Sequence, residues 1–227
     1  MSMEGKSMEI SKKVIVIITL TILPLVFLGS KVLTDTKQRL VDEELNLVRP
    51  ILEGIAENLK EPYRFPLDSR SELQGFASFN TASRFPHLYH AAIDYFAEVG
   101  EPVYAIADGV VSYSGYMNGY PGVVIIDHPK ENLYSLYGHL SLKSWLVSKG
   151  AIKKGDLLGY IADPSEDFGI GVNAHIHFSI RMGSRMEYPE TGPDRWMGGY
   201  TTEPPIFKGY IDPEQFILLT KSKLSRN

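Results

Sequence analysis

Two histidines separated by one residue are the feature of this sequence with the clearest chemical potential. They stand in Ala174-His175-Ile176-His177-Phe178, among apolar neighbours. Side chains alternate between the two faces of a β-strand, so His175 and His177 would lie on the same face. Imidazole binds metals and exchanges protons near neutral pH. The pair therefore predicts a metal ligand beside a proton-transferring group, although a strand with an ordinary polar face explains it equally well.

A histidine and an aspartate four residues apart form a second candidate, in His90-Ala91-Ala92-Ile93-Asp94. Residues at this spacing share a face in a strand and in a helix. The apolar neighbours of Asp94 predict a buried carboxylate, which needs a cation or hydrogen bonds. His90 and Asp94 are therefore a plausible half of a zinc site, with a surface His–Asp hydrogen bond as the alternative.

A fourth histidine, His139, completes a pattern that resembles a known family. The resemblance is carried, in one order, by HAAIDYFAEVGEPVYAIADGVV, VVIIDHPKENLYSLYGHLS, KKGDLLGYI and AHIHFSI. These segments resemble the lysostaphin-type (LytM-domain) zinc metallopeptidases, which cut peptide cross-links in bacterial peptidoglycan. The similarity extends from about residue 75 to residue 182.

The resemblance implies a role for each residue that matches a family motif. It places the zinc ligands on His90, Asp94 and His177, and the catalytic histidines on His139 and His175. Three protein ligands leave a fourth position on zinc for a water molecule. The implied reaction is attack of this zinc-bound water on an amide carbonyl, assisted by the two histidines.

Two further residues are expected to contact the substrate, Asn118 and Tyr137. The resemblance also allows Asn118 to coordinate zinc in a resting enzyme, as in some family members, and Asn118-Gly119 is a typical hairpin turn, so three roles stay open for it. The other two histidines, His87 and His128, are not expected to bind the metal.

The sequence departs from the family pattern in three places. Ala92 stands where the family usually has glycine, which matters only if that backbone needs a positive φ. An acidic stretch over residues 163–173 replaces a glycine- and threonine-rich one, so substrate preference cannot be transferred. Beyond Gly183 no family motif is found, and Arg195, Trp196 and Tyr200 either line a groove or pack an ordinary loop.

The elements that must position these residues are predicted to be β-strands. Between His90 and Met182, short apolar runs such as Val123–Ile126 and Leu157–Ile161 alternate with turn signals such as Lys154-Gly155-Asp156. This alternation of apolar runs and turns predicts an all-β core, an antiparallel β-sandwich or barrel-sandwich hybrid of the LytM type. Residues 183–210 are expected to form a long loop, followed by a short helix at Glu214–Leu219.

The N-terminal part has a different character. Lys12 and Lys13 precede an apolar run from Val14 to Leu28, which suits a signal peptide, or a membrane anchor if it extends to Leu33. Apolar residues then recur at helical spacing from Val41 to Leu59, with Pro50 expected to kink or divide the helix.

These features predict four regions and an extracytoplasmic protein. Residues 1–33 would be a cytoplasmic tip with the signal peptide or anchor, residues 34–60 a helical stalk, residues 61–220 the metallopeptidase domain and residues 221–227 a tail. The lysines before the apolar run favour an N-terminus inside the cell. The domain would then act in the periplasm or at the cell surface, membrane-anchored or secreted.

Composition excludes some classes of binding partner and of metal site. The net charge is −4 without a long basic block, which argues against nucleic acid, and the absence of cysteine excludes disulfides and thiolate zinc sites. The expected function is a zinc (Zn²⁺) metalloendopeptidase acting on peptidoglycan stem peptides. Two alternatives stay open: a catalytically inactive LytM-type regulator of cell-wall amidases, for which the stalk would serve a regulatory partner, and a cytoplasmic phosphoryl-carrier domain.

Overall fold

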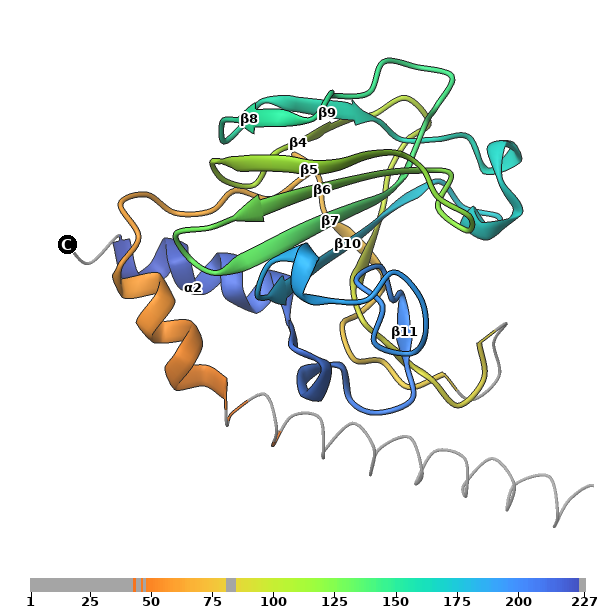
Figure 1. The fold of residues 1–227 in the computed structure, drawn as a ribbon. Helices are drawn as coiled ribbons and strands as arrows, with labels where there is room; N and C mark the ends of the chain where they lie inside the picture. The colour runs from red at the N-terminus through yellow and green to blue at the C-terminus, as the bar shows by residue number, and fades with distance from the viewer. Residues whose placement is uncertain (1–42, 44–45, 47, 81–84, 225–227) are drawn as a thin grey trace, which may run out of the picture. The chain divides into compact units, whose positions relative to one another are not determined.

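A large antiparallel β-sheet organises the part of the chain that the structure, a computed structural model, describes: residues 43, 46, 48–80 and 85–224 (Figure 1). This eight-stranded sheet has the order β1-β3-β10-β7-β6-β5-β8, and β12 also pairs with β10. Two small two-stranded sheets, β2–β11 and β4–β9, accompany it. The antiparallel β core predicted from the sequence is therefore confirmed.

The elements have the following bounds. The strands are Ser71–Gln74 (β1), Tyr89–His90 (β2), Ile93–Phe96 (β3), Pro102–Tyr104 (β4), Gly109–Tyr116 (β5), Gly122–His128 (β6), Leu133–Leu140 (β7), Gly150–Ile152 (β8), Leu157–Tyr160 (β9), His175–Met182 (β10), Tyr200–Thr201 (β11) and Tyr210–Ile211 (β12). The helices are α2 (Pro213–Leu224) and the 3₁₀ turns Pro164–Glu166, Phe168–Ile170, Arg185–Glu187 and Pro205–Lys208.

Two turn signals of the sequence lie between strands, as predicted. Asn118-Gly119 forms the turn between β5 and β6, and Gly155 lies between β8 and β9. Gly119 has φ 89° and Gly155 has φ 87°. Glycine adopts these left-handed conformations without the clash that a Cβ atom would cause.

The main hydrophobic core lies on one face of the large sheet. Alternate residues of β3 and β10, namely Ile93, Tyr95, Ile176 and Phe178, pack there with residues of the β4–β9 sheet and of α2. The side chains between them point to the other face, because strand residues alternate. The core thus fixes which residues of β3 and β10 are available for a site.

The C-terminal part contains more regular structure than the sequence predicted. Helix α2 has 12 residues, whereas a helix over Glu214–Leu219 was expected. Residues 183–210 contain β11, the start of β12 and two 3₁₀ turns, where a long loop was expected. These short elements are stabilised by pairing with distant strands, which leaves no local periodicity in the sequence.

The N-terminal predictions are only partly covered by the described residues. Residues 48–57 are helical, and Pro50 does not end the helix. Leu52 and Ala56 are buried on it. The membrane segment predicted within residues 1–33 lies outside the described residues. Among the residues that are described, no helix combines the length and the apolar character needed to cross a membrane.

Candidate metal centre

Strand register brings Asp94 and the histidine pair together. Strand β10 lies between β3 and β7, with His177 directly opposite Asp94 on β3 and Gly138 on β7. His175 and His177 share the face opposite the core residues Ile176 and Phe178, as their spacing predicts. All three polar side chains are at most 6% exposed.

His90 reaches the same point from a different sheet. It lies on β2, and the chain bends at Ala91 and Ala92 before Asp94 follows on β3. His90 and Asp94 therefore belong to two different strands. The bend is stabilised by burial of both alanines and by the amide of Ala91, which donates to the carbonyl of Gly199 at 2.9 Å. Ala92 does not have a positive φ, so its methyl group causes no backbone strain.

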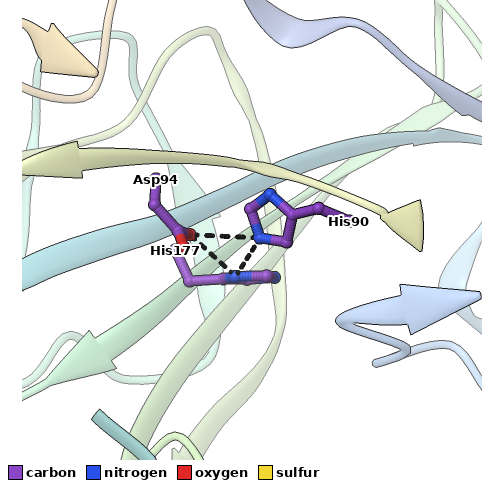
Figure 2. A group of neighbouring side chains, drawn as sticks. All are labelled: His90, Asp94 and His177. Carbon is purple, nitrogen blue, oxygen red and sulfur yellow. Dashed lines mark hydrogen bonds and ion pairs between the residues drawn. The ribbon is translucent and has the colours of Figure 1, made fainter. Parts of the chain in front are cut away.

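Three potential ligand atoms converge between these strands (Figure 2). His177 Nδ1 is 3.0 Å from Asp94 Oδ1 and 3.3 Å from His90 Nε2. His90 Nε2 is 3.4 Å from the same carboxylate oxygen. A tetrahedral zinc ion with ligands at about 2.0–2.1 Å separates them by about 3.3–3.4 Å. The observed triangle therefore has the size that such an ion requires.

Hydrogen bonding at this point also favours a cation. His90 Nδ1 donates to the carbonyl of Gly75 at 3.2 Å, so the neutral ring presents a lone pair at Nε2. That lone pair faces Asp94 Oδ1 and His177 Nδ1. A single proton on His177 Nδ1 cannot form a hydrogen bond to the carboxylate oxygen and to His90 Nε2 at the same time. A bound metal ion would satisfy all three atoms at once, so the donor set fits the zinc site predicted for His90, Asp94 and His177.

The electrostatics of Asp94 support a charged carboxylate. Burial raises the pKa of Asp94, but His90 and the hydrogen bond from His177 lower it, and the net pKa is well below the usual value. For His177, burial lowers the pKa more than Asp94 raises it. A charged carboxylate and a neutral imidazole are the forms in which these two groups bind metals.

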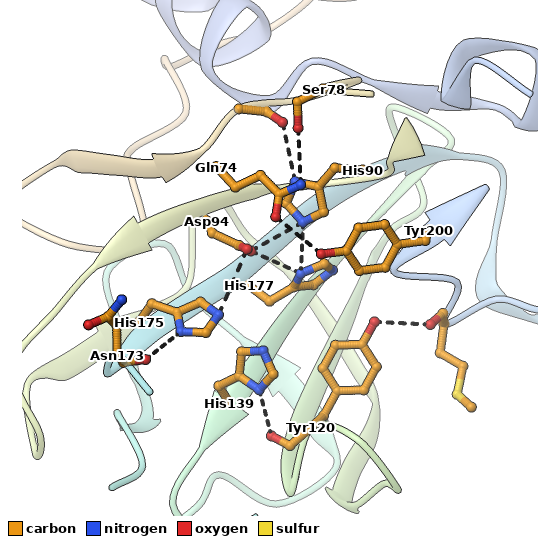
Figure 3. A network of polar contacts seen from close by, with 12 residues as sticks. Gln74, Ser78, His90, Asp94, Tyr120, His139, Asn173, His175, His177 and Tyr200 are labelled. Atoms are coloured by element: carbon orange, nitrogen blue, oxygen red, sulfur yellow. Dashed lines mark hydrogen bonds and ion pairs between the residues drawn. The ribbon is translucent and has the colours of Figure 1, made fainter. Parts of the chain in front are cut away.

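The other two histidines of the predicted site lie beside this cluster (Figure 3). The rings of His139 and His175 are 4.5 Å apart, and His175 Nε2 is 3.8 Å from Asp94 Oδ2. His139 Nδ1 donates to the carbonyl of Tyr120 at 3.3 Å, and His175 Nδ1 donates to that of Asn173 at 2.8 Å. Each neutral ring therefore keeps its basic lone pair at Nε2.

His139 has an unusual backbone conformation, with φ 63°. A left-handed conformation is uncommon for residues other than glycine and is found where the surrounding structure enforces it, often at functional sites. Burial and the neighbouring His175 and His177 lower the pKa of His139 well below its usual value. The ring is thus held in the neutral form, with the lone pair at Nε2 free.

The remaining predicted residues do not join the cluster. Tyr137 is completely buried in the main core, where its hydroxyl oxygen accepts from the amide of Ile106 at 3.1 Å, so the prediction that it contacts substrate is wrong. Its cross-strand partner Phe178 faces the same core, whereas the left-handed backbone of His139 interrupts the alternation that would otherwise place His139 on the core face as well. Asn118 is exposed in the β5–β6 turn, His128 is buried in the sheet and His87 is exposed.

Sequence reasoning missed the residues that hold these histidines in place. The carbonyls of Gly75, Tyr120 and Asn173 each accept a hydrogen bond from a ring nitrogen of the site. Tyr200 packs its ring 5.2 Å from that of His90. Backbone acceptors have no signature in the sequence, whereas Tyr200 had been noted as a residue that either lines a groove or packs a loop.

The chain is similar to known peptidases over its central part. It is 33% identical over 100 residues to the DD-carboxypeptidase/endopeptidase Mpg of Neisseria meningitidis serogroup B, covering 44% of this chain and 22% of that protein. It is 30% identical over 133 residues to an uncharacterized metalloprotease of Haemophilus influenzae, covering 56% and 26%. The chain thus spans about a quarter of the length of these relatives.

Solved structures agree with the fold. The antimicrobial peptidase lysostaphin from Staphylococcus simulans superimposes with a TM-score of 0.52 at 20% identity, covering 71% of this chain and 55% of that chain. At this identity the likeness concerns the fold alone. Residues 88–189 match Peptidase family M23 and contain all five histidine and aspartate residues of the site. The resemblance inferred from the sequence motifs is thus confirmed for residues 88–189, the part of the chain that matches Peptidase family M23.

Proposed function

We propose that this protein is a zinc-dependent metalloendopeptidase that hydrolyses peptide cross-links of bacterial peptidoglycan. The observation that carries the proposal is the convergence of His90 Nε2, Asp94 Oδ1 and His177 Nδ1 within 3.4 Å of one another, with two further histidines beside them. The M23 domain and the endopeptidase named among its relatives support the same activity.

Three residues would hold the metal. His90, Asp94 and His177 supply two nitrogens and one oxygen, the donor set of many catalytic zinc sites. When bound, zinc polarises a carbonyl group and lowers the pKa of a water molecule toward neutrality. The carbonyl of Gly75 fixes which nitrogen of His90 faces the metal, because it accepts from Nδ1.

Two residues would move protons. His139 and His175 both present Nε2 lone pairs, since backbone carbonyls occupy their Nδ1 protons. One ring can accept a proton from the attacking water, and one can donate a proton to the leaving amine nitrogen. Their ring centroids are 4.5 Å apart, which supports the proposal that both act on the same peptide bond. Asn118, exposed on the neighbouring hairpin turn, is proposed to contact the substrate.

The location of the substrate sets the proposed organisation of the chain. Peptidoglycan lies outside the cytoplasmic membrane, so the domain over residues 61–220 would act in the periplasm or at the cell surface. Residues 1–33 would direct or anchor it, residues 34–60 would act as a stalk and residues 221–227 would be a tail.

The test is mass spectrometry of the products released by purified protein from purified peptidoglycan. We expect zinc-dependent cleavage of amide bonds in the cross-linked peptides, with new amine and carboxyl termini. A zinc-free protein with the same cleavage rate would overturn the metal mechanism. A zinc-loaded protein without cleavage that stimulates a cell-wall amidase would instead show the regulator.

A further inference from the structure

Residues 199–201, here called the β11 segment, lie against the metal ligands although they fall outside the M23 match over residues 88–189. Strand β11 pairs with β2 so that Tyr200 is directly opposite His90. The Tyr200 ring is 5.2 Å from the His90 ring, and its hydroxyl donates to Gln74 Oε1 at 3.1 Å (Figure 3). One wall of the ligand cluster is therefore built by a part of the chain that carries no ligand.

Gly199 is packed too tightly for any side chain. A Cβ atom at this position would lie 2.7 Å from the hydroxyl oxygen of Tyr120 and 3.4 Å from Cε1 of His177. Gly199 does not have a positive φ, so its backbone would accept alanine. Glycine at this position thus provides space beside Tyr120 and His177, and its conformational freedom is not needed.

Tyr120 connects the β11 segment to the histidines. Its ring lies 5.4 Å from that of His139 and 5.2 Å from that of His177. The ring also packs on Gly138, where a Cβ atom would come within 2.5 Å of Tyr120 Cδ1. Its hydroxyl donates to the carbonyl of Met197 at 3.2 Å. Tyr120 therefore packs closely on two glycines while its ring contacts two histidines of the site.

We propose that Gly199, Tyr200 and Tyr120 are positioning residues that fix the rings of His90 and His177 in the orientation that binds the metal. Tyr200 packs on His90, whereas Gly199 allows Tyr120 to pack on His177. This inference rests on the proposed zinc centre. Residues that orient metal-bound histidines typically change metal affinity about 10–100-fold when they are altered.

The experiment measures zinc affinity of the metal-free full-length protein by competition with a chromophoric chelator. Gly199→Ala should weaken zinc binding at least tenfold, because its methyl group displaces Tyr120 and His177. Gly198→Ala is the matched control, since its Cβ would approach Tyr210 and not a ligand, and it should bind zinc like the wild type.

A second substitution tests the route through Tyr120. Tyr120→Phe removes the hydroxyl that the new methyl group would meet, and the next neighbour is 3.4 Å away. In this background, Gly199→Ala should therefore weaken zinc binding less than about threefold. An undiminished loss in the Tyr120→Phe background would contradict the proposed route.

Tyr200→Ala keeps the inference testable if Gly199→Ala does not fold. We expect at least a tenfold loss of zinc affinity, with the Tm of the metal-free protein close to the wild-type value. Wild-type affinity in Tyr200→Ala, or in a folded Gly199→Ala, overturns this inference alone. A wild-type protein that binds no zinc overturns the proposed function as well, so the two failures are distinguishable.

Discussion

His128 and the cluster of His90, Asp94 and His177 are all buried, yet their ring nitrogens have opposite surroundings. His128 Nδ1 donates to the carbonyl of Asp108 at 2.8 Å, and its Nε2 accepts from the hydroxyl of Ser135 at 2.9 Å. Both nitrogens therefore have complementary partners. In the cluster, a lone pair of His90 faces a carboxylate oxygen and another imidazole nitrogen.

The difference separates a structural histidine from a ligand. A buried polar group that is fully hydrogen-bonded stabilises the fold and needs nothing further. A buried group that faces other acceptors is unfavourable until a cation or proton lies between them. Hydrogen-bond complementarity, and not burial alone, therefore distinguishes His128 from the histidines that we propose as metal ligands.

The largest effect is expected from Asp94→Asn, which keeps the shape of the side chain but removes its charge. The cluster loses its anionic ligand, so zinc affinity should fall and peptidoglycan cleavage should drop about a thousandfold, since the metal supplies several kcal/mol of transition-state stabilisation. Product release measured by mass spectrometry tests this. His128→Phe is the control and should retain zinc. Wild-type cleavage in Asp94→Asn would show that the carboxylate is not needed for activity and would contradict its role as a metal ligand.

His139→Ala should separate proton transfer from metal binding. The residue contacts the cluster but supplies none of the three converging atoms. We expect zinc to remain bound at one ion per chain while cleavage falls about 10²–10⁴-fold, the usual contribution of a general acid or base. Zinc content and cleavage rate are measured on the same sample. Loss of zinc together with activity would instead make His139 a ligand.

His128 should make stability depend on pH. Burial lowers the pKa of His128 from 6.5 to about 4. Between these values the unfolded chain binds the proton more readily, so the stabilisation is complete above pH 6.5 and is lost as the pH falls toward 4, by about 3 kcal/mol. The free energy of unfolding of His128→Phe, measured by urea denaturation, should lack this component relative to wild type. Parallel pH curves for the two proteins would be the contrary result.

Tyr137→Phe should have the smallest effect and should act on stability alone. The amide of Ile106 loses its acceptor, which costs about 1–2 kcal/mol for a buried donor. Because Tyr137 lies in the core, KM for a peptide substrate should not change. Urea denaturation measures the free energy of unfolding, and steady-state kinetics measure KM. A raised KM with normal stability would show instead that Tyr137 contacts the substrate.

The sequence predicted what depends on local patterns. Period-two alternation predicted that His175 and His177 share a face, and glycine-containing turns such as Asn118-Gly119 predicted the ends of strands. Both follow from interactions between near neighbours, so a single sequence reveals them. The family motifs added His139, which no local pattern connects to the pair.

The sequence could not predict what depends on distant contacts. The bend at Ala91 and Ala92 depends on a carbonyl more than 100 residues away, that of Gly199. Tyr137 was expected to contact the substrate, whereas its side chain packs in the core with that of Phe178, its partner on the neighbouring strand. No motif predicted a role for Tyr120, because its contacts are with Gly138 and Gly199, which belong to two separate segments.

X-ray absorption spectroscopy of the zinc-loaded protein tests most directly whether the converging atoms of His90, Asp94 and His177 bind metal. We predict one zinc per chain, with two imidazole nitrogens and a carboxylate oxygen at about 2.0–2.1 Å. His177→Phe should lose imidazole scattering, and His128→Phe should leave the spectrum unchanged. A wild-type spectrum without histidine ligands, or one that His177→Phe does not alter, would contradict the proposed site.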